Sequence, residues 1–190
     1  MHADTNNLEQ VKLSSSVTIG DFRKLEEEQN RQEIARFVQE RFSERYTEPL
    51  LSMRKKHGFC MMAICCLLIE AITAFRKGWQ DPTTRRNKPY REFFAGHPSM
   101  AVTPPLADAI YDHIRSGIFH LGETTGGWRI LRRGPLVDSN NKTVNAMRFL
   151  TEVQKSIEEY CEDLRQATWN KPIWQNFRNR MNALIRNCHG

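Results

Sequence analysis

The sequence predicts an all-α fold: an up-and-down helical bundle of four to five helices, with a small β-hairpin over residues 127–137. Apolar residues recur at helical spacing in several long segments, and Pro and Gly punctuate the stretches between them. The composition, 39% hydrophobic and 26% charged, is that of a globular chain. A length of 190 residues suits one domain, which we place at 18–190. Residues 1–17 are polar and aperiodic and are predicted to be a flexible N-terminal arm.

The first predicted helix begins after Thr18. This residue can cap a helix, and Asp21 follows three positions later, which is the spacing of a capping box. Apolar residues then recur at helical spacing among Glu, Gln and Arg, and the helix is expected to end near Tyr46–Pro49.

The second predicted helix, Phe59–Phe75, is apolar on nearly all sides and is stopped by Gly78. A membrane-spanning helix needs about 20 apolar residues, whereas this run is shorter and contains Glu70. We therefore interpret it as the central core helix of a soluble bundle and expect no membrane association.

The later elements follow from breakers and apolar stripes. Pro104 and Pro105 suit the first turn of a third helix, in which an apolar residue recurs every fourth position up to Ile118. The remaining predictions are a short helix at Tyr90–Ala95, a turn at Asp138–Lys142, a helix from Thr143 to Ala167 and a last helix after Pro172.

The chain carries a net charge of +6, and 19 of its 28 basic residues are Arg. A positive field favours polyanions such as RNA, although a solvated basic surface is the equal alternative. The five cysteines form no CxxC pair, and an odd count favours a reducing compartment, which we take to be the cytoplasm. No clustered ligands predict a metal site, and no cofactor is expected.

The segment Arg115-Ser-Gly-Ile-Phe-His120 is the best candidate for a functional site. Arginine binds a phosphate and stabilises charge that develops on it, and histidine transfers a proton near neutral pH. Together they suit attack of an RNA 2′-hydroxyl on the adjacent phosphodiester, without a metal. The alternative is structural: Arg115 would pair with Asp112 or Asp108, and His120 would be a cation at a helix end.

The spacing constrains the catalytic interpretation. Five positions on a helix turn through about 500°, so the two side chains would point about 140° apart. They converge only if the helix ends or bends near Gly117, or if two copies of the chain meet. A second match of the same kind, Arg91 to His97, lies in the Pro-rich connection and ranks lower.

The two segments IRSGIFHLGET and CCLLIEAITAFRKG resemble the HEPN superfamily, over roughly residues 58–125 and with weaker support at 143–167. The resemblance implies a four-helix bundle with an Arg-x(4–6)-His motif. Members are often metal-independent ribonucleases of defence or toxin systems, and they dimerise so that two motifs face each other. Others are non-catalytic modules that bind RNA, a nucleotide or a protein. Active members frequently carry Asn, His or Asp after the Arg, where this chain has Ser116.

The predicted catalytic set follows from this resemblance and from the chemistry above. His120 would be the general acid and base, Arg115 would bind the scissile phosphate, and Glu70 or Ser116 would support them. As the only charge in its apolar run, Glu70 is expected to have a structural or orienting role. An endoribonuclease acting as a homodimer is the leading hypothesis, and a non-catalytic binding module is the alternative.

A second candidate surface follows His120. An aromatic residue among arginines suits single-stranded nucleic acid, because bases stack on the ring while phosphates contact the cations. The alternative is a solvated hairpin with one core tryptophan. The residues concerned are Trp128, Arg129, Arg132 and Arg133.

Overall fold

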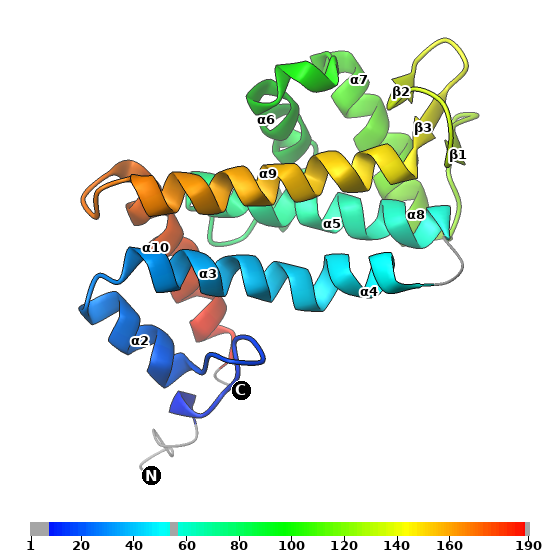
Figure 1. The fold of residues 1–190 in the computed structure, drawn as a ribbon. Helices are drawn as coiled ribbons and strands as arrows, with labels where there is room; N and C mark the ends of the chain where they lie inside the picture. The colour runs from blue at the N-terminus through cyan, green and yellow to red at the C-terminus, as the bar shows by residue number, and fades with distance from the viewer. Residues whose placement is uncertain (1–7, 54–56, 189–190) are drawn as a thin grey trace. The chain divides into compact units, whose positions relative to one another are not determined.

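The computed structural model describes residues 8–53 and 57–188, and this part of the chain is mostly helical with a small three-stranded sheet (Figure 1). The predicted mainly helical class is confirmed. The chain divides into two compact units. The first comprises Met1–Leu51, Phe75–Asp81 and Ile157–Gly190, and the second comprises Ser52–Ala74 and Pro82–Ser156. Two of the four boundaries between them fall inside long helices, α5 (Gly58–Lys77) and α9 (Ala146–Gln166).

The first unit begins with two helices where the sequence predicted one. Helix α2 (Ile19–Glu27) starts at the predicted capping box, in which the Thr18 side chain and Asp21 cap each other's amides. The single long helix is wrong, because the chain turns at Gln29, whose φ of 52° lies in the left-handed region. Asn30 then caps a new helix, α3 (Arg31–Phe42), by accepting an amide hydrogen bond of 3.3 Å.

Helix α3 continues directly into a π-helical turn (Ser43–Thr47) and a short helix, α4 (Glu48–Ser52). The predicted end near Tyr46–Pro49 is therefore too early. Pro49 lies in α4, directly after the π-helical turn.

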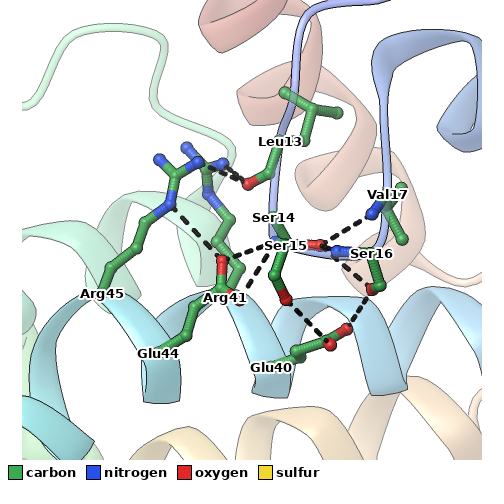
Figure 2. A network of polar contacts seen from close by, with 9 residues as sticks. All are labelled: Leu13, Ser14, Ser15, Ser16, Val17, Glu40, Arg41, Glu44 and Arg45. Atoms are coloured by element: carbon green, nitrogen blue, oxygen red, sulfur yellow. Dashed lines mark hydrogen bonds and ion pairs between the residues drawn. The ribbon is translucent and has the colours of Figure 1, made fainter.

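Residues 13–17 are fixed on α3 and the π-helical turn (Figure 2). Leu13 is only 2% exposed, and its carbonyl oxygen accepts hydrogen bonds from Arg41 and from Arg45, the latter at 2.7 Å. A flexible arm is the wrong description of this segment, because a buried leucine and several hydrogen bonds anchor it. Residues 1–7 of the predicted arm lie outside the described residues.

Aromatic rings fill the core of the first unit. The ring of Phe75, near the end of α5, lies 5.8 Å from that of Phe42, 6.2 Å from Tyr160 and 5.9 Å from Phe177. Phe177 belongs to the last helix, α10 (Pro172–Arg186). The sequence predicted this helix after a break at Pro172, and the helix begins at that residue. Edge-to-face and offset contacts at these distances add stability beyond the buried area.

The second unit contains α5 up to Ala74 and a series of shorter helices. Helix α5 confirms the predicted second helix, and Gly78 follows it with a φ of 67°. Tyr90 is fully buried and donates its hydroxyl to the carbonyl oxygen of Cys66 at 3.3 Å, which ties the predicted short helix to α5. The shorter segments are a 3-10 turn (Thr83–Arg85), α6 (Lys88–Gly96), a 3-10 turn (Pro98–Met100), α7 (Pro104–Ala109), a π-helical turn (Ile110–Arg115) and α8 (Ser116–Leu121).

The predicted hairpin within residues 127–137 is wrong. The sheet consists of β1 (Arg129–Leu131), β2 (Val137–Asp138) and β3 (Thr143–Asn145), in the order β1-β3-β2. Strand β3 pairs antiparallel with β2 and parallel with β1, so the hairpin is β2–β3. The turn predicted at Asp138–Lys142 joins these strands, and α9 begins at Ala146 instead of Thr143 because Thr143–Asn145 belongs to the sheet.

Helix α5 is 20 residues long and apolar enough to cross a membrane by length and composition, and 56% of its most apolar window is buried within the structure. The core helix of a soluble protein passes the same test. The expectation that the chain does not associate with a membrane therefore stays a prediction.

Candidate functional site

Arg115 lies in the middle of a helical segment that runs without interruption from Pro104 to Leu121. Helix α7 passes into the π-helical turn, and α8 follows directly with helical backbone at each junction. Ile110 and Ile114 are fully buried and fix which face of the segment meets the core. The segment ends where Gly122 adopts a left-handed φ of 70°.

Arg115 and Glu70 form an ion pair. The Nε of Arg115 donates to Oε1 of Glu70 at 2.8 Å, and the two side chains are 20% and 16% exposed. Glu70 projects from the otherwise apolar α5, so its charge is compensated within the second unit. Asp108, one of the alternative partners predicted for Arg115, binds Arg91 instead.

Two aromatic rings flank the guanidinium of Arg115. Its Cζ lies 5.1 Å from the ring centre of Phe119 and 5.5 Å from that of Tyr111. These residues stand four positions after and four before Arg115, where side chains share one helix face. Tyr111 in turn meets the buried Tyr90 at 5.5 Å, edge to face. Cation–π contacts and the Glu70 bond therefore hold the guanidinium in one orientation.

The surroundings keep Arg115 charged. Burial is the largest single effect and acts to lower the pKa of Arg115. The hydrogen bond and negative charge of Glu70, with smaller effects of Tyr90 and Tyr111, outweigh it and raise the pKa above its ordinary value. Arg115 is therefore a cation at neutral pH.

The terminal nitrogens of Arg115 have no acceptor in the described part of the chain, because its one hydrogen bond there uses Nε. Nη1 and Nη2 thus remain available on a guanidinium that is already oriented. This is the arrangement in which an arginine binds an oxyanion with two parallel hydrogen bonds.

His120 is not brought to Arg115 within one chain. It lies exposed near the end of α8, and its ring has no polar partner among residues 8–53 and 57–188. Because the helix is continuous between the two residues, their side chains diverge by about 140°. A bend that would bring them together is absent from α8. Because the helix does not break near Gly117, Arg115 and His120 could act together only where two copies of the chain meet.

Gly117 was expected to let the helix bend, but in the structure it makes room for a neighbouring loop. It is buried in regular helix, and the loop after α8 crosses directly over it. A Cβ atom at this position would lie 2.4 Å from the carbonyl oxygen of Glu123 and 3.2 Å from Cα of Thr124. The absence of a side chain permits this close approach, which returns the chain along the helix. Ser116, beside it, is half-buried and makes no side-chain hydrogen bond within the described residues.

The second candidate surface is only partly assembled. Trp128 is 6% exposed, so the predicted stacking role of this ring is wrong: the indole packs in the core, as the alternative interpretation held. Arg129, Arg132 and Arg133 are exposed on and after β1. Arg129 donates weakly to the carbonyl oxygen of Asn141 at 3.4 Å. These arginines are accessible to a polyanion, and an exposed aromatic ring of this unit, that of Phe119 at 47% exposure, lies beside Arg115.

Arg91 and His97, the second Arg–His match, are both engaged in contacts with nearby residues. Arg91 binds both carboxylate oxygens of Asp108, and its Nε lies 2.6 Å from Oδ1. The hydrogen bond from Arg91 is the main reason that the pKa of Asp108 lies below its usual value. His97 contacts the carbonyl oxygen of Phe93 at 2.6 Å and stacks on its ring. The ion pair of Arg91 and Asp108 therefore links α6 to α7.

Sequence reasoning missed the aromatic residues around Arg115. The signal was present, since Tyr111 and Phe119 stand at i−4 and i+4 of the arginine. Within residues 8–53 and 57–188, no three His, Cys, Asp or Glu side chains gather in a group that could hold a metal ion. Comparison of the chain with protein-family models, curated proteins and solved structures found no match.

Proposed function

We propose that this protein binds a phosphate group of RNA or of a nucleotide at Arg115. The observation that carries the proposal is the oriented guanidinium whose Nη1 and Nη2 have no acceptor in the described chain, while Nε is held by Glu70. An arginine fixed in this way loses little further side-chain freedom when it binds an oxyanion.

The half-exposed ring of Phe119 supports a ligand that carries a base as well as a phosphate. It lies against the same guanidinium, so a phosphate on Arg115 would bring a neighbouring base within reach of this ring. Base stacking contributes about 1–3 kcal/mol per base and tolerates any sequence. The exposed arginines after β1 add a salt-dependent, sequence-independent attraction.

Binding of a short single-stranded RNA, measured by fluorescence anisotropy over a salt series, tests this proposal. We expect Arg115→Ala to weaken binding about tenfold or more and to lower the slope of log Kd against log salt by roughly 0.7, the loss of one phosphate contact. Arg115→Lys should also bind weakly, because lysine cannot hold Glu70 and a phosphate at once.

Arg36→Ala is the matched control. It removes the same charge from a side chain that is 73% exposed and paired with Glu33 in the first unit. Equal Kd values for Arg115→Ala, Arg36→Ala and the unchanged protein would contradict the proposal.

A second candidate function is metal-independent RNA cleavage by a homodimer, the activity implied by the resemblance to HEPN ribonucleases. The exposed ring of His120, which has no polar partner in the part of the chain that the structure describes, favours it, because that ring is accessible to a second copy. In such a dimer Arg115 of one chain would bind the scissile phosphate, and His120 of the other would transfer the proton. The second unit would then be a HEPN-like helical bundle of a cytoplasmic defence or toxin system.

Mixing two inactive variants distinguishes a site shared between copies from a site within one chain. Arg115→Ala and His120→Ala should each abolish cleavage in excess EDTA. If two copies share each site, mixing them regenerates one intact site per heterodimer, which is roughly a quarter of the original activity at random pairing. No recovery on mixing would refute the shared site, and unchanged cleavage by either variant alone would refute the catalytic roles.

A further inference from the structure

The segment Leu13–Val17 forms a serine-rich turn closed by its own hydrogen bonds (Figure 2). The amide of Leu13 donates to the carbonyl oxygen of Val17 at 2.8 Å, and an antiparallel bridge joins Lys12 to Thr18. The buried hydroxyl of Ser14 accepts from the amide of Val17 at 3.0 Å. The turn therefore keeps its shape through local contacts, and its tip is presented as a unit.

Two glutamates of α3 and the π-helical turn hold this tip. The amide of Ser15 donates to both carboxylate oxygens of Glu44, at 2.9 and 3.0 Å. The hydroxyl of Ser16 donates to Glu40 at 2.6 Å, and that of Ser15 reaches the same carboxylate at 3.4 Å. Both carboxylates act as acceptors, so the turn is held by its hydrogen-bond donors.

The tip borders an open, acidic groove of about 530 Å³. Its lining carries Glu40, Glu44 and Glu48 against a single cation, Arg36, which already pairs with Glu33. Arg41 and Arg45 both donate to the carbonyl oxygen of Leu13, and Nε of Arg45 also lies 3.9 Å from Oε1 of Glu44. Ser15 and Ser16 are exposed on this groove.

We propose that Ser16 is a phosphorylation site and that residues 13–17 are a clasp which a phosphoryl group opens. A protein kinase would transfer the γ-phosphoryl of a nucleoside triphosphate. The bond from Oγ of Ser16 to phosphorus forms, the bond to the bridging oxygen breaks, the diphosphate leaves and the hydroxyl proton passes to solvent.

The product differs from serine in two ways that act together. Phosphoserine has no hydroxyl proton, so the 2.6 Å bond to Glu40 is lost. It also places close to two negative charges beside the Glu40 and Glu44 carboxylates, where like charges repel. Release of the tip withdraws the carbonyl oxygen of Leu13 from Arg41 and Arg45, so that the half-buried Arg41 becomes accessible beside Arg45, which is already exposed.

Hydrogen exchange of the full chain tests the clasp, with phosphoserine installed at position 16 during synthesis. The reporters are the amides of Leu13, Ser14 and Ile19, each bonded within the turn or its flanking bridge. We expect exchange to be about fivefold faster or more, the effect of one like charge about 4 Å away in the high dielectric of water. Phosphoserine at position 139, in the exposed β2–β3 turn, is the control and should leave these amides unchanged.

Two further variants separate repulsion from the loss of one hydrogen bond. Ser16→Ala removes the bond without adding charge. Because Ser16 is exposed and water replaces its bond to Glu40, this variant should speed exchange about threefold or less, the low end for a hydrogen bond. Glu40→Lys combined with phosphoserine 16 turns the repulsion into an ion pair and should restore slow exchange. The proposal is overturned if phosphoserine 16 leaves exchange unchanged, if phosphoserine 139 or Ser16→Ala matches its effect, or if Glu40→Lys fails to restore protection.

Discussion

Replacing Gly117 by alanine is the sharpest test of how the helix that carries Arg115 is built. Two opposing effects follow from the structure. Alanine favours a helix over glycine by about 1 kcal/mol, so propensity alone predicts a more stable protein. The added Cβ, however, would lie 2.4 Å from the carbonyl oxygen of Glu123, well inside any normal contact.

We expect the steric clash to outweigh the gain in helix propensity. Relief requires the backbone of the loop after α8 to move by nearly 1 Å, because the clashing atom belongs to the backbone and cannot rotate away. That movement would strain the 2.9 Å hydrogen bond from the amide of Thr125 to the carbonyl oxygen of His113. Overpacking of this kind costs about 1–3 kcal/mol. Because backbone must move, we take the upper part of this range, about 2–3 kcal/mol. After the gain of about 1 kcal/mol in propensity, we expect Gly117→Ala to lower the free energy of unfolding by roughly 1–2 kcal/mol.

Urea and thermal unfolding followed by circular dichroism provide the measurement. For a chain of this size, 1 kcal/mol corresponds to a shift in Tm of about 2–4 °C. Gly96→Ala is the control, because Gly96 ends α6 with nothing within 4 Å of an added Cβ. That variant should be unchanged or slightly stabilised. A Gly117→Ala protein as stable as Gly96→Ala would refute the close approach of the loop.

Three further outcomes are expected. A double-mutant cycle of Glu70→Gln and Arg115→Met, measured by urea unfolding, should give a coupling energy of about 2 kcal/mol, because a partly buried ion pair keeps only part of its Coulomb energy after desolvation. Losses of stability that simply add would contradict an interaction between Glu70 and Arg115. Tyr160→Phe should raise the free energy of unfolding by about 1 kcal/mol, because the buried hydroxyl has no hydrogen-bond partner in the described chain; a calorimetric loss would contradict this. Hydrogen bonds from Ser15 lower the pKa of Glu44, so the clasp should be fully closed above the ordinary glutamate value of about 4.3 and lose exchange protection as the pH falls below it; protection that is constant down to pH 2 would exclude this linkage.

Local patterns predicted the helices whose apolar faces are continuous. Helices α5 and α10 are found where the spacing placed them, because burial of such a face determines the structure largely by itself. The break before α3 was missed because it depends on one residue, Gln29, in a left-handed conformation. The spacing of apolar residues on either side gives no sign of it.

Local sequence patterns could not predict the strand pairing of the sheet or the whole geometry around Arg115. Strand β1 pairs with β3 fourteen residues later, in parallel, and no turn signal specifies that register. The pairing of Arg115 with Glu70 was foreseeable, because a charge in an apolar helix requires a partner. The continuity of the helix between Arg115 and His120 was not, because Gly117 is as compatible with a break as with the close packing observed.

The division of α5 and α9 between two units has a consequence for the order in which the chain folds during synthesis. All segments of the second unit have left the ribosome once Ser156 has emerged, so its contacts can form early. The first unit must wait for α10, because Phe177 completes a core that begins with Phe22, 6.0 Å away in space. Synthesis proceeds at about 5–20 residues per second, so α2 and α3 remain without their last partner for several seconds. During that interval the nascent chain exposes the apolar helix faces that α10 later covers.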